Sequence, residues 1–200
     1  MAIAEIPTSI TIKTTGQSLF KRPQEKFHLP GEAKFGILTT GLVLEVNRVS
    51  GTASIIGAPY IVGENAFYED PNGKCFKTLT PSHVDIYHVD LLYNSSNLMT
   101  RVMQLAAKRS RDSIEKAADM FNLSAKRRFA KLLAQISEEF GCSELPVTQQ
   151  ELSQVIGTSR EAMTKASDEL RRMGLLSFRK GWITVKPKAT ERLWAIANRS

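Results

Sequence analysis

The stretch "VTQQELSQVIGTSREAMTKASDELRRMGLL" (residues 147–176) decides the fold of this 200-residue chain. Thr148-Gln-Gln-Glu151 has the S/T-x-x-E form of a capping box, and it opens a short helix that should stop at Gly157. Thr158-Ser-Arg-Glu161 repeats that form and opens a second helix that should run to about Gly174. Two capped helices joined by a tight glycine turn predict a helix-turn-helix.

The segments on either side extend this motif into a winged domain. Upstream, "FNLSAKRRFAKLLAQISEEFGC" (121–142) has apolar residues at helical spacings and ends at a glycine. Downstream, "LLSFRKGWITVKP" (175–187) predicts a strand, a basic turn at 179–181 and a second strand. We therefore expect a winged helix-turn-helix, a DNA-binding domain, over residues 122–200.

The second helix of the motif carries a polar face with both charge signs. Arg160, Glu161, Thr164 and Lys165 fall in its first two turns, the part of such a helix that enters a major groove. Arginine can donate two hydrogen bonds to guanine, and glutamate can accept from the cytosine amino group. Glu161 would repel phosphate, which favours base selection over generic DNA binding. The alternatives are a Glu161 that only caps the helix at Thr158, or a solvated structural face.

Other polar residues are expected to position the DNA backbone. Thr148, Gln150 and Ser159 lie at helix starts, where hydroxyl, amide and backbone N–H groups meet phosphate oxygens. Arg179 and Lys180 lie in the turn of the wing, where they would follow the phosphates.

The first ninety residues predict short strands. Segments 34–46, 53–62, 74–80 and 83–89 are β-rich and are interrupted by glycine and proline. Strands this short and closely spaced indicate a β-barrel or sandwich over residues 1–90, shortened enough that some strands are expected to be missing.

Residues 91–121 contain neither proline nor glycine and predict one long helix, with a hinge to the basic module near residues 122–124. Small and apolar residues recur in a stripe along this helix at alternating spacings of four and three residues, a pattern that is typical of a coiled-coil seam. The stripe consists of Met99, Met103, Ala106, Ser110, Ser113, Ala117 and Met120. We expect this helix to pair two chains in a homodimer; the alternative is a helix that packs only on its own domain.

Charge and cysteine content limit the class of protein. Residues 1–100 carry 8 Lys/Arg and 9 Asp/Glu, whereas residues 101–200 carry 19 and 11. A neutral module joined to a basic one indicates a polyanionic partner, here double-stranded DNA. Two cysteines cannot form a disulfide framework, and neither a membrane span nor a secretion signal is visible. These features predict a soluble protein of the cytoplasm without a membrane partner.

From Gly63-Glu64 to about Val185 the chain resembles the CRP/FNR family of bacterial transcription regulators, most specifically in the helix-turn-helix stretch quoted above. The resemblance implies an α+β protein with a cyclic-nucleotide-binding-like β-barrel, a dimerisation helix and a winged helix-turn-helix. It implies that Arg160 and Glu161 read a TGTGA-like half-site of a pseudo-palindromic operator. Lys165 stands where the cyclic AMP receptor protein has a base-reading arginine, and lysine lacks the bidentate fork. RNA polymerase is the further partner that the resemblance implies.

The barrel departs further from that pattern. The family's Gly-Glu, whose glutamate holds a ribose hydroxyl, matches Gly63-Glu64, but Lys74-Cys75 stands where an Arg-Ser pair holds the cyclic phosphate. Ser113 matches an adenine-contacting threonine. Loss of the guanidinium weakens phosphate capture, so we expect no strong response to cyclic AMP, although an unknown effector of the barrel stays open. The four-cysteine iron–sulfur pattern is absent, and no cofactor is expected.

Metal, redox and enzymatic functions are the remaining alternatives. His28, His83, His88 and Cys75 are candidate ligands, but their sequence positions show no compact metal site. Cys75 has Lys74 and Lys77 nearby, which favours its thiolate and leaves a redox role open. An enzyme with Cys75 as its nucleophile lacks a supporting motif, so we expect no catalytic activity. The rival function is a ligand-sensing or protein-interaction module that binds DNA without specificity.

Overall fold

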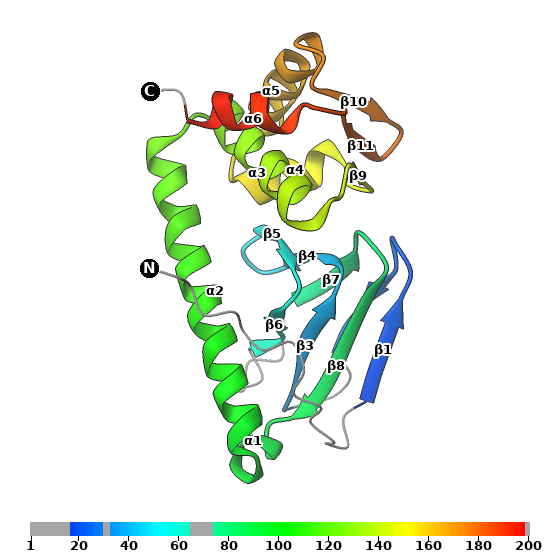
Figure 1. The fold of residues 1–200 in the computed structure, drawn as a ribbon, viewed down its shortest axis with the longest axis vertical. Helices are drawn as coiled ribbons and strands as arrows, with labels where there is room; N and C mark the ends of the chain where they lie inside the picture. Colours follow the sequence, from blue (N-terminus) through cyan, green and yellow to red (C-terminus); the bar gives the residue numbers. More distant parts are fainter. Residues whose placement is uncertain (1–16, 30–32, 65–73, 199–200) are drawn as a thin grey trace.

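A computed structural model describes residues 17–29, 33–64 and 74–198 of the protein. An N-terminal β-barrel lies beside the long helix α2 (Ser96–Asn122), and a smaller winged-helix domain sits on the end of the barrel (Figure 1). The expected α+β class and order of parts are thereby confirmed. The barrel strands are β1 (Gln17–Lys21), β2 (Lys26–Phe27), β3 (Lys34–Thr40), β4 (Leu42–Asn47), β5 (Ala53–Gly57), β6 (Tyr60–Val62), β7 (Lys74–Thr78) and β8 (Ser82–His88).

The barrel consists of two four-stranded antiparallel sheets, ordered β1-β8-β3-β6 and β2-β7-β4-β5. The four β-rich segments of the sequence contain six of these strands, because Gly41 and the Ala58-Pro59 step each divide one segment in two. β1 and β2 were not predicted. The described part of the chain thus holds eight strands before the first helix, and the expectation of missing strands is not met there.

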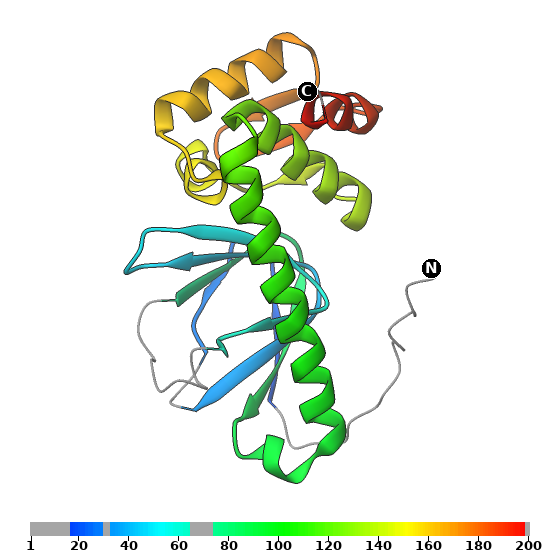
Figure 2. The same cartoon turned by 90° about the vertical axis from the view of Figure 1, so that its left-hand side faces the viewer.

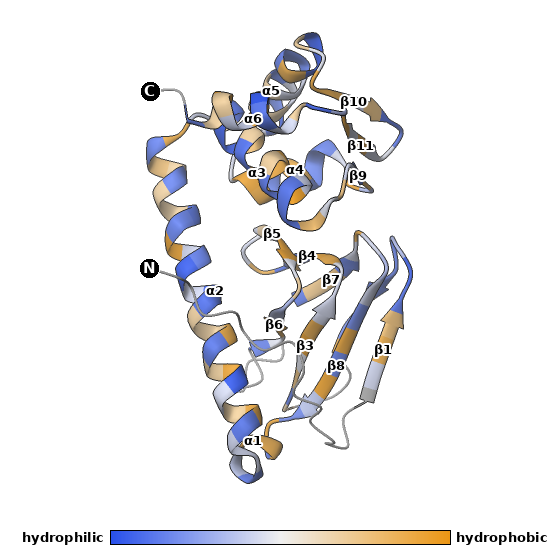
Figure 3. Cartoon of the chain, viewed as in Figure 1, coloured by the Kyte–Doolittle hydropathy of each residue, from blue (hydrophilic) through white to orange (hydrophobic). Residues whose placement is uncertain are grey.

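Each sheet buries one face in the barrel interior and part of its outer face against the rest of the protein, whereas the outer face at β1 is exposed, as Phe20 shows. The alternation of side chains along the strands assigns each residue to a face. Leu38, Val43 and Phe76 point between the two sheets and form the barrel interior. Phe35 and Ile37 point the other way, where they pack with Leu98, Val102 and Leu105 of α2. Hydrophobic residues accordingly lie along the barrel strands in Figure 3, while α2 alternates between hydrophobic and hydrophilic turns.

The helix predicted over 91–121 is divided in two. A single turn, α1 (Leu91–Asn94), is followed by Ser95, which has extended backbone and caps α2 by accepting a hydrogen bond from Leu98 N at 3.3 Å. α2 ends at Asn122, Leu123 is again extended, and Ser124 caps the next helix. The junction therefore lies at residues 122–124, where the sequence predicts the hinge.

The winged-helix domain comprises α3 (Ala125–Phe140), β9 (Glu144–Leu145), α4 (Gln149–Ile156), α5 (Arg160–Arg172), β10 (Leu176–Arg179), β11 (Trp182–Val185) and α6 (Thr190–Ala197). Its hydrophobic core continues into the barrel, because Leu42, Leu44, Ala53 and Leu79 on the outer face of one sheet join the same cluster. The views in Figures 1 and 2 both place α5 on the far side of this domain from the barrel. Among the described residues no helix is long and apolar enough to cross a membrane.

Candidate DNA-binding surface and sensor pocket

The start of α4 is fixed by the predicted capping box. Thr148 Oγ1 accepts from Glu151 N at 3.2 Å, and the Glu151 carboxylate accepts from Thr148 N at 2.8 Å. Glu151 also pairs with Lys77 of β7 at 2.5 Å, which ties the helix-turn-helix to the barrel. Burial opposes ionisation of Glu151, but Lys77 and Thr148 outweigh it and hold the pKa of this carboxyl below its usual range.

The turn between α4 and α5 differs in one detail from the sequence-based expectation. Gly157 is left-handed (φ 66°), as a tight helix-ending turn requires. The cap of α5 is Ser159, whose hydroxyl accepts from Ala162 N at 3.1 Å. Thr158 belongs to the turn, since its N–H donates to Ser153 O, so Glu161 does not serve a Thr158 cap.

The buried face of α5 holds the helix in the domain. Met163, Ala166 and Leu170 are buried, as their spacing predicts. Ser167 is fully buried beside them, which was not predicted, and Met173 is 40% exposed at the C-cap.

The opposite face of α5 is polar and accessible. Its hollow is lined by Arg160, Glu161, Thr164, Lys165, Asp168, Glu169 and Arg172. Towards the C-terminal end, ion pairs engage the acidic groups: Asp168 with Arg171 at 2.8 Å and Glu169 with Lys126 at 2.9 Å. Towards the N-terminal end, Arg160, Glu161 and Lys165 are exposed, and within the described part of the chain no hydrogen bond or ion pair involves their side chains.

The other residues that are expected to contact the DNA backbone are also at the surface. Gln150 is exposed at the start of α4, and Arg179 and Lys180 are exposed in the turn of the β10–β11 wing. Gln149, which was not predicted as a site residue, lies closer to α5, because its side-chain oxygen is 3.5 Å from Thr164 Oγ1. The only local sequence signal that Gln149 could be a site residue was its position directly after the Thr148 cap.

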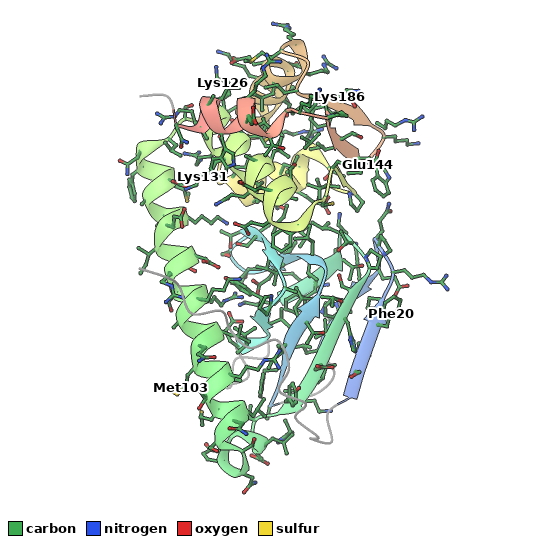
Figure 4. All side chains as sticks on the ribbon, viewed as in Figure 1. Phe20, Met103, Lys126, Lys131, Glu144 and Lys186 are labelled. Atoms are coloured by element: carbon green, nitrogen blue, oxygen red, sulfur yellow. The ribbon has the colours of Figure 1, made fainter. Side chains whose placement is uncertain are left out.

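On α2 the stripe that faces away from the barrel differs from the expected seam. Met103 is 64% exposed, Ile114 70% and Phe121 90%, and Figure 4 shows Met103 projecting on the side away from the barrel. At the same four-and-three spacing the outward stripe is Met103, Ala107, Ser110, Ile114, Ala117 and Phe121. Ala106 is exposed beside this stripe, whereas Met99 is partly buried against the cluster that joins α2 to the barrel.

Two further members of the expected seam also lie away from the outward stripe. Ser113 lines a cavity beside the barrel. Met120 faces the helix-turn-helix, since a Cβ on Gly157 would lie 2.6 Å from its methyl group.

The barrel and α2 together hold a cluster of four charged residues. Glu45 is 5% exposed; its carboxylate pairs with Lys74 at 2.9 Å and with Arg109 of α2 at 2.8 Å. Glu64 pairs with the same two cations, and its distance to Arg109 is 2.8 Å. Burial opposes the charge on Arg109, but Glu45 and Glu64 outweigh it and raise the pKa of the guanidinium. We call Glu45, Glu64, Lys74 and Arg109 the charge cluster.

The other expected effector residues lie at different places. Gly63 is left-handed (φ 73°) and precedes Glu64 at the end of β6. Cys75 lies on the opposite face of β7 from Lys74, because neighbouring side chains of a strand alternate. Ser113 donates to Arg109 O at 2.9 Å and lines the separate cavity. Of the five residues, the structure brings Glu64 and Lys74 into contact.

The candidate metal ligands are dispersed. His28 contacts the Lys74 carbonyl, His83 pairs with Asp85 at 3.5 Å, and His88 pairs with Asp90 at 3.2 Å. Within residues 17–29, 33–64 and 74–198 no three histidine, cysteine or acidic side chains are grouped as a metal site.

The barrel and the winged-helix domain are in close contact. Gly57 of β5 lies under Phe140 of α3, so that a Cβ at position 57 would be 2.0 Å from the Phe140 ring. Lys131 of α3 pairs with Glu115 and Asp119 of α2, each at 2.7 Å (Lys131 is labelled in Figure 4). Between these contacts lies the cavity of about 330 Å³ that Ser113 helps to line.

Comparison with known proteins agrees with this geometry. Residues 127–192 match the Crp-like helix-turn-helix domain. A curated relative, the CRP-like cAMP-activated global transcriptional regulator of Mycobacterium tuberculosis, is 24% identical over 149 residues, which are 68% of this chain. The match spans 63% of that regulator's length, less than two thirds.

Solved structures share the fold over nearly the whole chain. A CRP-family transcriptional regulator from Thermus thermophilus has a TM-score of 0.73 at 18% identity, covering 91% of this chain and 97% of that one. A CRP/FNR-family regulator from the same organism has a TM-score of 0.72 at 20% identity, covering 92% and 99%. The chain thus carries a Crp-like helix-turn-helix domain over residues 127–192 and shares the overall fold of these CRP/FNR-family regulators.

Proposed function

We propose that the protein is a homodimeric transcription regulator of the cytoplasm that recognises a pseudo-palindromic DNA operator through the start of α5. The observation that supports this most strongly is that Arg160, Glu161 and Lys165 are exposed and make no side-chain hydrogen bond or ion pair with the described residues. They belong to α5, which lies at the end of the molecule away from the barrel (Figure 1). A surface that bound DNA only through its phosphates would be weakened by the exposed carboxylate of Glu161, which repels phosphate. Base edges in a major groove offer both donors and acceptors to such a set.

Each of these three side chains has an expected partner. Arg160 would donate to guanine O6 and N7, and Glu161 would accept from a cytosine amino group, as in a TGTGA-like half-site. Lys165 is a point charge that reaches guanine or phosphate. Ser159 and Thr148 already hold their own helix ends, so their contribution to phosphate binding would come through the backbone N–H groups beside them.

The dimer is supported by the outward stripe of α2. A soluble monomer rarely exposes a continuous apolar stripe, and Met103, Ile114 and Phe121 lie along one with small residues between them. Pairing two such helices about a twofold axis would place two copies of α5 about 34 Å apart, in successive major grooves.

We further propose that DNA binding does not depend on cyclic AMP. In the charge cluster two carboxylates neutralise two cations. A cyclic phosphate would therefore have to displace Glu45 or Glu64 from Lys74 and Arg109. Cyclic AMP should therefore leave the affinity for DNA unchanged. A tenfold tightening in its presence would contradict this part of the proposal. Recruitment of RNA polymerase stays a prediction from the family resemblance.

The test of base reading compares Arg160→Ala with Arg179→Ala on a selected operator and on random DNA. Arg160→Ala should cost ~1–3 kcal/mol on the operator and much less on random DNA. Arg179→Ala is the matched control, since a wing contact to phosphate should weaken binding to both DNAs alike. If Arg160→Ala also weakened both alike, the rival function, DNA binding without specificity, would be favoured.

A further inference from the structure

Thr164 lies one helical turn after Arg160, in the middle of the polar face of α5. It is partly buried, whereas Arg160, Glu161 and Lys165 around it are exposed. A threonine on a DNA-facing surface can act through its hydroxyl, as donor or acceptor, or through its methyl group.

The hydroxyl of Thr164 is already engaged within the protein. Its single proton is donated to the Arg160 carbonyl at 2.9 Å, the i−4 bond that threonine often makes in helices. The same oxygen lies 3.5 Å from the side-chain oxygen of Gln149 on α4. A staggered χ1 angle that holds the hydroxyl against these two groups leaves the Cγ2 methyl in a different direction, away from them.

We propose that Thr164 selects a thymine in each half-site by contact of its methyl group with the thymine C5-methyl. This inference rests on the proposed function, and it adds Thr164 to Arg160, Glu161 and Lys165 as a residue that determines which bases are recognised. Thymine alone presents a methyl group in the major groove. Four residues span about 6 Å along a helix and a base step is about 3.4 Å, so the thymine should lie within about two base pairs of the guanine that Arg160 contacts.

The contact predicts a measurable preference. One buried methyl group is worth about 4-fold in affinity, and symmetric half-sites repeat it, so removal of both thymine methyls should weaken binding by about 15-fold. The probe is the duplex recovered by selection with the wild-type protein, in which each thymine of the half-site is replaced in turn, on both half-sites, by deoxyuridine. Deoxyuridine keeps the base pairing and lacks only the methyl group.

Two variants separate the methyl from the hydroxyl. Thr164→Val keeps the methyl group. It should bind the thymine duplex with wild-type affinity and should still bind the deoxyuridine duplex more weakly. Thr164→Ser keeps the hydroxyl and should bind the thymine and deoxyuridine duplexes equally, both at the weaker level. Thermal unfolding of the three proteins checks that each is folded.

The outcomes distinguish this inference from the proposed function. A wild-type protein that shows sequence preference but is indifferent to deoxyuridine at every thymine overturns the role of Thr164 alone. So does a Thr164→Val protein that loses the operator while Thr164→Ser keeps it. A wild-type protein that binds all duplexes alike overturns the proposed function and this inference together.

Discussion

Replacement of Ile114 by alanine should separate the dimer. The substitution removes three carbon groups at ~0.8 kcal/mol each, or ~2.4 kcal/mol for a fully buried side chain. In the single chain 70% of Ile114 is exposed, so most of that surface is open to a partner. Because a twofold axis repeats the contact, Ile114→Ala should cost ~3 kcal/mol of association free energy, which weakens the dimer by about two orders of magnitude.

Sedimentation equilibrium measures that change directly. Val49 offers a matched control, since it is 82% exposed on the turn between β4 and β5, far from the outward stripe in sequence and fold. Val49→Ala should leave the dimer dissociation constant unchanged. Equal dissociation constants for the Ile114 and Val49 variants would refute the assignment of the outward stripe as the dimer contact.

Three further predictions concern the barrel and its contact with the winged-helix domain. Gly57→Val should overpack the contact with Phe140 and lower the free energy of unfolding by ~1–3 kcal/mol. Adding Phe140→Ala to this variant should restore part of the lost stability. If denaturant titration showed that the losses of the two substitutions simply add, direct contact between the two residues would be contradicted. The depressed pKa of Glu151 stabilises the protein above the unfolded carboxyl pKa of about 4.3, and this contribution is lost as pH falls through the lower folded value. Glu151→Gln should therefore make the free energy of unfolding less dependent on pH in that acid range. An unchanged pH profile would exclude the Lys77 pair as the cause of the acid dependence. Arg109→Leu should cost ~3–5 kcal/mol of folding free energy because it leaves Glu45 buried with one cation fewer, and a midpoint in urea within error of wild type would contradict that.

Local chemistry explains why the helix-turn-helix was predictable. The Thr148 capping box and Gly157 each use groups within a few residues, so the boundaries of α4 and α5 follow from the sequence nearly to the residue. The shift from Thr158 to Ser159 at the second cap arises because either hydroxyl suits that role and the Gly157 turn decides between them. β1 and β2 lack such signals, since they are short and gain their pairing from β8 and β7 far along the chain.

The stripe on α2 and the charge cluster depend on contacts that no local pattern specifies. Two heptad registers share Met103, Ser110 and Ala117, and packing of Leu98 and Val102 on the barrel chooses the one that turns Ile114 outward. Glu45 was missed because a carboxylate in the apolar strand "LVLEV" is the sole local sign of a buried ionic group. Its partners Lys74 and Arg109 come from another strand and from the long helix.

The most direct test of base reading by α5 is selection from a pool of random duplexes with the purified protein, without added nucleotide. The expected result is enrichment of one short sequence in two inverted copies, with centres about 10–10.5 base pairs apart, as twin α5 helices require. A pool that stays random after repeated rounds, despite salt-dependent binding, would contradict the claim that Arg160, Glu161 and Lys165 discriminate between base pairs.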